Sequence, residues 1–179
     1  MDQIQIEPIA EHLLSPAQQR EIAQLLNTSF PGYPAERTYY MQLPHFRFLA
    51  SFDQQLIGHL AVTHRMINAG GDPARIFGLG DLCIHQSYQQ QKIGSLLMKA
   101  VEEEALLRQL DFLVLVTDEQ EFYLSKGFSP LNNLCRWVSI RNHETFGIVQ
   151  GRLSKGLLIK SVSGKKWGDG VVDLLGYMF

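Results

Sequence analysis

Alternating apolar and polar residues predict strands in the first half of the chain. The stretch IQIEPI, residues 4–9, has the period of a half-buried strand. Over residues 46–68 the alternation runs on both sides of a polar centre at 53–55, which predicts two strands joined by a tight turn. An apolar run with glycines follows at 75–85 and predicts a third strand. Together these segments predict an antiparallel meander.

Apolar residues at helical spacing predict two long helices. In residues 15–30, Ser15 suits an N-cap and Pro16 the first helical position. In residues 92–109, the apolar positions follow the spacing of one helical face: Ile93, Leu96, Leu97, Ala100, Val101 and Ala105. Each helix is therefore expected to bury one face.

Two shorter helices are expected as well. Residues 35–43, AERTYYMQL, are rich in aromatic side chains and end before Pro44. Residues 119–128, EQEFYLSKGF, contain Gly127, which suits a C-terminal cap.

The second half of the chain adds further strands. FLVLV, residues 112–116, is typical of a buried strand, and its place after a helix predicts a parallel strand–helix–strand crossover. CRWVSI at 135–140 and GLLIKSV at 156–162 predict two more strands, whereas residues 142–156 and 164–179 show little periodicity. The order of elements predicts an α/β fold (α+β, with a mixed sheet): one mixed, mostly antiparallel sheet flanked by helices. A length of 179 residues is usual for one domain, so a single domain over residues 1–179 is expected.

Composition and charge exclude several classes of partner. Sixteen basic and eighteen acidic residues give a net charge of −2 without a basic run, so a nucleic-acid partner is not expected. No segment approaches the roughly 18 apolar residues that span a membrane, so a soluble protein without a membrane partner is expected. The N-terminal residues lack the basic and apolar regions of a secretory signal, and a cytoplasmic location is therefore expected.

Cysteines and histidines give no sign of a metal site. Cys83 and Cys135 lie in strand-like apolar runs without metal-ligand spacing, so buried reduced thiols are expected. The six histidines show no metal-type pairing, and no metal cofactor is expected.

The segment DLCIHQSYQQQKIGSLL, residues 81–97, contains the clearest candidate for chemistry. It passes from an apolar strand through a polar loop with a glycine into the start of a helix. A helix N-terminus has unpaired N–H groups and the positive end of the helix dipole, so this loop is a candidate anion site.

Residues 79–128 resemble the core of the GNAT superfamily of acyl-CoA-dependent N-acyltransferases. The family signature is Arg or Gln, two residues, Gly, one residue, then Gly or Ala. It falls on Gln89, Gln90, Gln91, Lys92, Ile93 and Gly94, with Lys92 where the family has glycine. A second hallmark is a tyrosine shortly before a Gly-Phe pair, here Tyr123 before Gly127 and Phe128. The resemblance implies a GNAT-like fold, acetyl-CoA as the acyl donor and N-acetyltransferase activity.

The resemblance also implies roles for individual residues. Main-chain N–H groups would hold the pyrophosphate of coenzyme A, from the loop Gln89, Gln90, Gln91, Lys92, Ile93, Gly94 and Ser95. If position 92 demands a positive φ, Lys92 is mildly strained there, and its ammonium could also contact phosphate oxygens. In the family the preceding strand is bulged and splays from its neighbour, so Leu82, Cys83 and Ile84 would pair with the pantetheine arm.

Two side chains are candidates for proton transfer. Tyr123 matches the family's general acid, which protonates the departing thiolate. Asp81 is the nearest carboxylate on the strand and the first candidate for the general base, with His85 as the second. A structural role for either residue stays open.

The chain further resembles a branch related to aminoglycoside 2′-N-acetyltransferases. The likeness lies in IAQLLNTSF, LIGHLAVTHRMI and the C-terminal KKWGDGVVDLLGYMF. In that branch, C-terminal residues fold back near the acceptor pocket. The corresponding residues here are Trp167, Gly170 and Asp173. Asp173 could hold a cationic amine there, and a purely structural tail is the alternative. Segments 30–45 and 142–156 would line the pocket, with Tyr33, Tyr39 and Tyr40 as candidate wall residues.

The function expected is transfer of acetyl from acetyl-CoA to a primary amine of a small molecule, by direct attack in a ternary complex. A non-catalytic acyl-CoA-binding module and an acetyltransferase for a protein N-terminus or lysine are the alternatives. A homodimer is possible, since family members often dimerise.

Overall fold

The computed structural model describes residues 4–153 and 156–179, which divide into two compact units. The first unit contains the residues up to Val62 together with Gly80–Val101. The second contains Thr63–Leu79 and Glu102–Phe179. Three elements pass from one unit into the other: the strands β3 (Gln55–Ala69) and β4 (Pro73–Ile84) and the helix α2 (Ile93–Leu107). The expectation of a single domain over residues 1–179 stays a prediction.

The first unit contains an antiparallel sheet built from the N-terminal strands. β1 (Gln5–Ala10) pairs with β2 (Phe46–Phe52), and β2 pairs with the first part of β3. At the turn between β2 and β3, Asp53 and Gln54 have φ of 48° and 63°, the left-handed conformation that tight hairpin turns require. The predicted hairpin over 46–68 is therefore confirmed.

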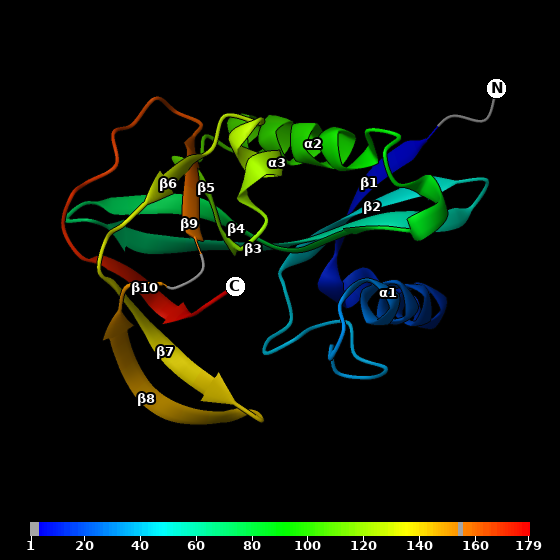
Figure 1. The fold of residues 1–179 in the computed structure, drawn as a ribbon, viewed down its shortest axis with the longest axis horizontal. Helices are drawn as coiled ribbons and strands as arrows, with labels where there is room; N and C mark the ends of the chain where they lie inside the picture. The colour runs from blue at the N-terminus through cyan, green and yellow to red at the C-terminus, as the bar shows by residue number, and fades with distance from the viewer. Residues whose placement is uncertain (1–3, 154–155) are drawn as a thin grey trace. The chain divides into compact units, whose positions relative to one another are not determined.

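In the first unit, α1 (Pro16–Ser29) and the first part of α2 lie on opposite faces of this sheet (Figure 1). α1 begins with a capping box, in which Ser15 and Gln18 each accept a hydrogen bond from the other's main-chain N–H. Its apolar face packs into a core that includes Leu49 and Cys83. On the other face, Gly58 lies against Ile93 at the start of α2, where a Cβ would come within 3.3 Å of that side chain.

The prediction of a helix over residues 35–43 is wrong. Residues 31–45 form turns and bends, in which Arg37 N–H donates to the carbonyl of Pro34 and Glu36 has a φ of 58°. Prolines flank this short segment at positions 34 and 44 and remove N–H donors, and its aromatic residues make ring contacts instead of forming a helical face.

The second unit contains a mixed sheet whose strand order is β6-β9-β5-β4-β3-β10-β7-β8. β4 and β5 run parallel, as the predicted crossover requires, and the neighbouring β5–β9 and β7–β8 pairs are antiparallel. The elements not yet given are β5 (Phe112–Thr117), the short helix α3 (Gln120–Leu124), β6 (Ser129–Leu131), β7 (Cys135–Arg141), β8 (Glu144–Gly151), β9 (Gly156–Ser161) and β10 (Val172–Tyr177). The predicted fold class, an α/β fold with a mixed sheet flanked by helices, is confirmed.

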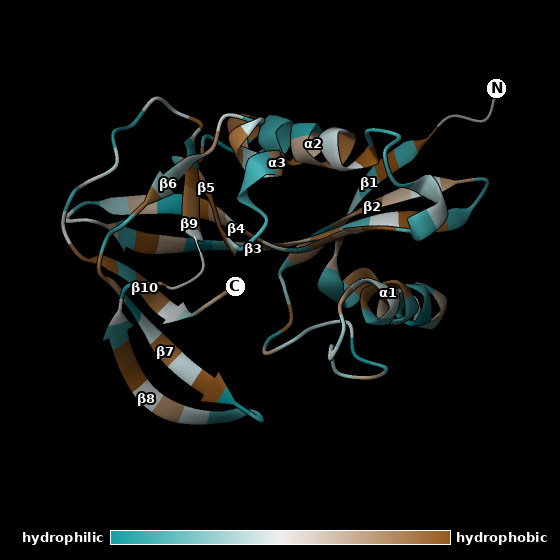
Figure 2. Ribbon diagram, viewed as in Figure 1, coloured by the Kyte–Doolittle hydropathy of each residue, from teal (hydrophilic) through white to brown (hydrophobic). Residues whose placement is uncertain are grey.

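β5 and β9 supply much of the second unit's core. They appear as brown apolar strands in Figure 2, and Phe112, Val114, Leu157 and Ile159 are buried there. Among the described residues, no helix has both the length and the apolar character needed to cross a membrane.

Candidate functional site

The end of β4 has the irregular backbone expected before a cofactor loop. Asp81, near the end of β4, has a φ of 52°. A non-glycine residue with this φ in a strand marks a local break in the pleat. The ladder with β5 takes in Ile76–Leu79, and Leu82, Cys83 and Ile84 lie beyond its end. Cys83 is buried and unpaired, as expected for a reduced thiol, and so is Cys135.

The loop between β4 and α2 is exposed and held by local hydrogen bonds. Gln89 donates its main-chain N–H to the carbonyl of Gln86 and its side-chain amide to the carbonyl of Ile84, at 3.3 Å each. Gln91 donates its side-chain amide to the carbonyl of Ser87 at 3.4 Å. The amide side chains therefore stabilise the loop from within.

Two residues of this loop adopt the left-handed conformation. Gln90 and Lys92 both have a φ of 64°. Lys92 therefore occupies a backbone position that glycine adopts at lower cost, as its place in the family signature suggested. The exposed ammonium of Lys92 stands directly before the helix N-terminus.

The N-terminus of α2 offers main-chain donors to an anion. The N–H of Leu96 donates to the carbonyl of Lys92 at 3.0 Å and opens the helical ladder. Ile93, Gly94 and Ser95 precede it, and the N–H groups of such a first turn have no carbonyl within the helix. The side chain of Ile93 is buried, so this residue can offer only its main chain. The arrangement suits a phosphate or pyrophosphate group.

Asp81 is hydrogen-bonded through its side chain to Tyr33. The hydroxyl of Tyr33 donates to Oδ2 of Asp81 at 2.8 Å. Burial raises the pKa of Asp81 above its ordinary value, while the Tyr33 hydrogen bond and the charge of Arg47 act in the opposite direction. Burial and the neighbouring Asp81 raise the pKa of Tyr33 well above its ordinary value, so its proton stays on the hydroxyl.

A buried polar network adjoins Asp81 and was missed in the sequence. The side chain of Arg47, on β2, is completely buried. Its Nε donates to Oε2 of Glu11 at 2.6 Å, its Nη2 to the carbonyl of Thr38 at 2.7 Å, and its Nη1 lies 2.7 Å from Nε2 of His59. The only signal for this network in the sequence is a polar residue within each of the apolar strands FRFLASF and LIGHLAV.

The network fixes the tautomer of His59. A guanidinium has only donors, so Nε2 of His59 accepts from Arg47 and the ring proton lies on Nδ1. Nδ1 then donates to the main-chain carbonyl of Asp81 at 2.9 Å. Burial, together with the charge of Arg47, lowers the pKa of His59 to about 3, and the ring is neutral at ordinary pH.

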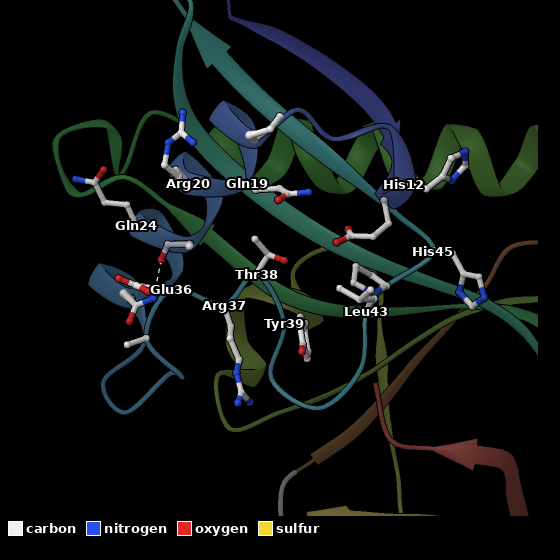
Figure 3. Close-up of a pocket in the computed structure, with 16 residues that line it drawn as sticks. His12, Gln19, Arg20, Gln24, Glu36, Arg37, Thr38, Tyr39, Leu43 and His45 are labelled. Carbon is white, nitrogen blue, oxygen red and sulfur yellow. Dashed lines mark hydrogen bonds between the residues drawn. The ribbon is translucent and has the colours of Figure 1, made fainter. Parts of the chain in front are cut away.

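An open groove of about 1330 Å³ lies beside this network in the first unit. Figure 3 shows Gln19, Arg20 and Gln24 of α1 on one side of it and Thr38, Tyr39 and Leu43 of the irregular segment on another. Glu11 also lines the groove, which places one partner of Arg47 at its wall. Of the three tyrosines predicted to form pocket walls, Tyr39 lines the groove. Tyr33 is buried instead, and its ring contacts those of Phe30 and Tyr40.

Tyr123 and Asp173, the remaining predicted site residues, lie in the second unit. Tyr123 is on the short helix α3, where its ring contacts those of Phe122 and Phe128 at centroid distances of 5.0 and 5.8 Å. Burial raises the pKa of Tyr123 to about 12, so its hydroxyl stays protonated at neutral pH. Among the described residues, no hydrogen bond to this hydroxyl is found.

Asp173 is already engaged by other groups of the second unit. Its Oδ2 lies 3.4 Å from Nη1 of Arg136 in an exposed ion pair, and its Oδ1 accepts the N–H of Leu175. Trp167 packs edge to face on Phe112, and Gly170 donates its N–H to the carbonyl of Gly70. These C-terminal residues therefore have packing and hydrogen-bonding roles within the second unit.

His85, the second candidate base, accepts the N–H of Ser87 through Nδ1 at 3.3 Å. Its ring lies edge to face on Tyr88. Within residues 4–153 and 156–179, no cluster of three or more potential metal ligands is found.

Comparison with known proteins defines the class of the fold. Residues 44–130, which include β2–β5, α2 and α3, match the family described as acetyltransferase (GNAT) domain. A comparison with curated protein sequences finds no match.

Solved structures with this fold are GNAT proteins of low sequence identity. A GNAT family N-acetyltransferase (YhbS) from Escherichia coli, in complex with CoA, is 16% identical over 96% of this chain and 88% of its own, with a TM-score of 0.64. The ribosomal-protein-S18-alanine N-acetyltransferase from Escherichia coli is 13% identical over 92% of this chain and 97% of its own, with a TM-score of 0.64. A probable N-acyltransferase from Enterococcus faecalis is 17% identical over 75% of this chain, with a TM-score of 0.61, and the chain spans 33% of its length. The chain thus has the fold of GNAT N-acetyltransferases, and residues 44–130 carry the sequence pattern of an acetyltransferase (GNAT) domain.

Proposed function

We propose that this protein is an N-acetyltransferase that moves acetyl from acetyl-CoA to a primary amine of a small molecule, by direct attack in a ternary complex. The observation that carries the proposal is the backbone of residues 81–95 within the segment matched as an acetyltransferase (GNAT) domain. A break in β4 at Asp81 is followed by a loop with two left-handed residues and by the free N–H groups of α2. The CoA bound to the Escherichia coli relative of the same fold supports acetyl-CoA as the donor.

The loop before α2 binds the cofactor in this proposal. The main-chain N–H groups around Ile93, Gly94 and Ser95 hold the pyrophosphate, with Lys92 adding its charge. Leu82, Cys83 and Ile84 offer main-chain groups to the pantetheine arm, in the manner of an added strand. One of these N–H groups polarises the thioester carbonyl, which gains negative charge as the amine attacks.

Proton transfers complete the reaction. The amine gives a proton to Asp81, its nitrogen forms a bond to the acetyl carbon, and the bond from that carbon to sulfur breaks. Tyr123 donates to the departing sulfur of coenzyme A. Since the pKa of Tyr123 is about 12, above that of an ordinary thiol, the phenol stabilises the sulfur by a strong hydrogen bond as its charge develops.

Two of the resemblances bear on the class of acceptor. The aminoglycoside branch suggests a polyamine-like acceptor, whereas one relative of the same fold is named for acetylation of a protein's alanine. Asp173 would bind a cationic acceptor only by giving up its exposed ion pair with Arg136. A panel of acceptors therefore has to include both small amines and peptides.

The test is a mass-spectrometric screen of the purified protein with acetyl-CoA. The panel contains aminoglycosides, polyamines, amino-acid derivatives, a lysine peptide and a peptide with a free N-terminal alanine, and the control is Tyr123→Phe. An acetylated small amine whose formation falls by about 10² in the control supports the proposal. Acetyl-CoA binding without product from any amine supports a binding module, and product from a peptide alone supports a protein acetyltransferase.

A further inference from the structure

Asp81 is held from two sides by residues outside the acetyltransferase signature. Tyr33, from the irregular segment 31–45, donates its hydroxyl to the carboxylate Oδ2 at 2.8 Å. His59, from β3, donates Nδ1–H to the main-chain carbonyl of the same residue at 2.9 Å. Among the described residues, no hydrogen bond to the other carboxylate oxygen, Oδ1, is found. One carboxylate oxygen is thus hydrogen-bonded, whereas the other has no hydrogen bond to the described residues.

The strained backbone of Asp81 explains why two such contacts are useful. A φ of 52° is unfavourable for a residue that has a Cβ, and the conformation persists only where the surroundings determine it. A hydrogen bond to the carbonyl of Asp81 fixes the peptide plane that follows it, and one to the carboxylate fixes its side chain. Together they determine both the direction of the side chain and the break in β4.

Arg47 ensures that His59 presents the correct donor. Because Arg47 occupies Nε2 of His59, the proton of the neutral ring must lie on Nδ1, which faces Asp81. Arg47 is itself fixed by Glu11 and by the carbonyl of Thr38. Burying an arginine and its charged partner costs free energy of desolvation. Apolar side chains of similar volume would fill the same space without a loss of stability. What apolar side chains would not provide is the orientation of His59 and, through it, of Asp81.

We propose that Tyr33 and His59 are positioning residues for Asp81, which hold its backbone and one carboxylate oxygen so that Oδ1 can take the proton of the acceptor amine. The inference rests on the proposed function and extends it to residues that the family signature does not contain. Arg47 also helps to position Asp81, although it acts through His59, whose tautomer it sets.

The titration of Asp81 provides a direct measure of the Tyr33 contact. The charged or titratable groups around Asp81 are Tyr33 of segment 31–45, Arg47 of β2, His59 of β3 and Cys83 of β4. The Tyr33 hydrogen bond stabilises the carboxylate, so the pKa of Asp81 rises further when the hydroxyl is removed.

The first experiment follows the carboxyl carbons of ¹³C-labelled aspartate by NMR across a pH titration. Asp81→Asn identifies the signal, Tyr33→Phe tests the contact, and Tyr40→Phe is the matched control, since its ring lies 5.8 Å from that of Tyr33. The expected result is a higher titration midpoint for Asp81 in Tyr33→Phe and an unchanged one in Tyr40→Phe. An unchanged midpoint in Tyr33→Phe overturns the proposal.

The second experiment separates the two hydrogen bonds of His59. The amide N–H of asparagine stands near the place of Nδ1, and the amide oxygen of glutamine near that of Nε2. His59→Asn therefore keeps the donor to Asp81, whereas His59→Gln keeps only the acceptor for Arg47. The expected result is that kcat/KM falls about tenfold more in His59→Gln than in His59→Asn, at similar stability. Equal losses in the two variants overturn the role of His59.

The pH dependence of the reaction links these measurements to catalysis. In Tyr33→Phe, the acid limb of the kcat/KM profile moves to higher pH by the same increment as the Asp81 signal. An acid limb that does not follow the signal overturns the positioning role. If the wild-type protein acetylates no acceptor, the proposed function fails, and the NMR titration of Asp81 in Tyr33→Phe and in the two His59 variants still decides whether these residues hold Asp81.

Discussion

Nη1 of Arg47 lies 2.7 Å from Nε2 of His59, and both side chains are completely buried. Only one of these groups can be charged at so short a distance, and it is the guanidinium, which stays protonated in proteins. Its compensating charge is the carboxylate of Glu11, whose side chain is 13% exposed. The core of the first unit therefore contains one ion pair and one neutral histidine whose protonation would place two positive charges side by side.

Replacing Arg47 by methionine should destabilise the protein strongly. The change leaves the carboxylate of Glu11, the carbonyl of Thr38 and Nε2 of His59 without their donor, and breaking a buried pair of this kind costs about 3–5 kcal/mol. Arg136→Met is the matched control, because its ion pair with Asp173 is exposed and should be worth less than about 1 kcal/mol. Urea denaturation of both variants measures the difference, and similar losses would contradict the importance of the buried network.

The buried His59 should make the protein less stable in acid. The unfolded chain protonates this histidine near pH 6.5, whereas the folded protein does so only near pH 3. Between these values the unfolded state binds more protons, so the free energy of unfolding falls as the pH is lowered, by up to about 1.4 kcal/mol per pH unit. Urea denaturation from pH 4 to pH 7 should show a smaller pH dependence in His59→Gln than in the wild type. His12→Gln, which changes an exposed histidine, should keep the wild-type dependence.

Local patterns in the sequence predicted the elements whose signals are local. The capping residues of α1, the alternation of β2 and β3 and the apolar run of β5 each follow from neighbouring residues. β8 was missed because its residues, ETFGIVQG, show no regular alternation, and they lie on an exposed edge of the sheet where all but the last are exposed. β10 was missed because it is irregular, with a φ of 49° at Leu175 and a shift of register against β7.

Only the part of the candidate site that is built from one continuous segment could be predicted from the sequence. The loop 89–95 is contiguous, so its pattern alone indicated an anion site. Arg47 and His59 meet because β2 and β3 pair with Leu49 opposite His59 and Arg47 opposite Ala61, a register that two separate sequence segments do not display. Tyr33 reaches Asp81 from an irregular segment, for which no periodic pattern exists.

A close approach of two main-chain segments in the second unit should make the stability of the protein sensitive to replacement of Gly168. A Cβ on Gly168 would lie 2.6 Å from the carbonyl oxygen of Gly70, and main chain cannot move aside as a flexible side chain does. Gly168→Ala should therefore cost about 1–3 kcal/mol. Gly151→Ala is the control, since the nearest atom to its Cβ would be 4.0 Å away on Trp137, and it should change stability by no more than about 0.5 kcal/mol. Thermal or urea denaturation compares the two variants, and equal stabilities would show that the close approach relaxes easily.

The equal φ of Gln90 and Lys92 allows backbone strain to be separated from charge at the proposed cofactor loop. Changing either residue to glycine relieves a left-handed conformation at a φ of 64°. The relief, of order 1–2 kcal/mol, is partly offset by the greater entropy of glycine in the unfolded chain, so each variant should gain less than about 1 kcal/mol of stability. Only Lys92→Gly also removes a positive charge.

Acetyl-CoA affinity should therefore distinguish these two variants. Lys92→Gly is expected to bind acetyl-CoA up to about fivefold more weakly than Gln90→Gly, because an exposed charge contact is worth at most about 1 kcal/mol. Titration calorimetry at low salt and at high salt measures the difference, which should shrink at high salt because ions screen exposed charges. The difference should persist with dephospho-CoA, which keeps the pyrophosphate and lacks the 3′-phosphate. Equal affinities at low salt would show that the main chain of the loop, without the ammonium of Lys92, carries the binding.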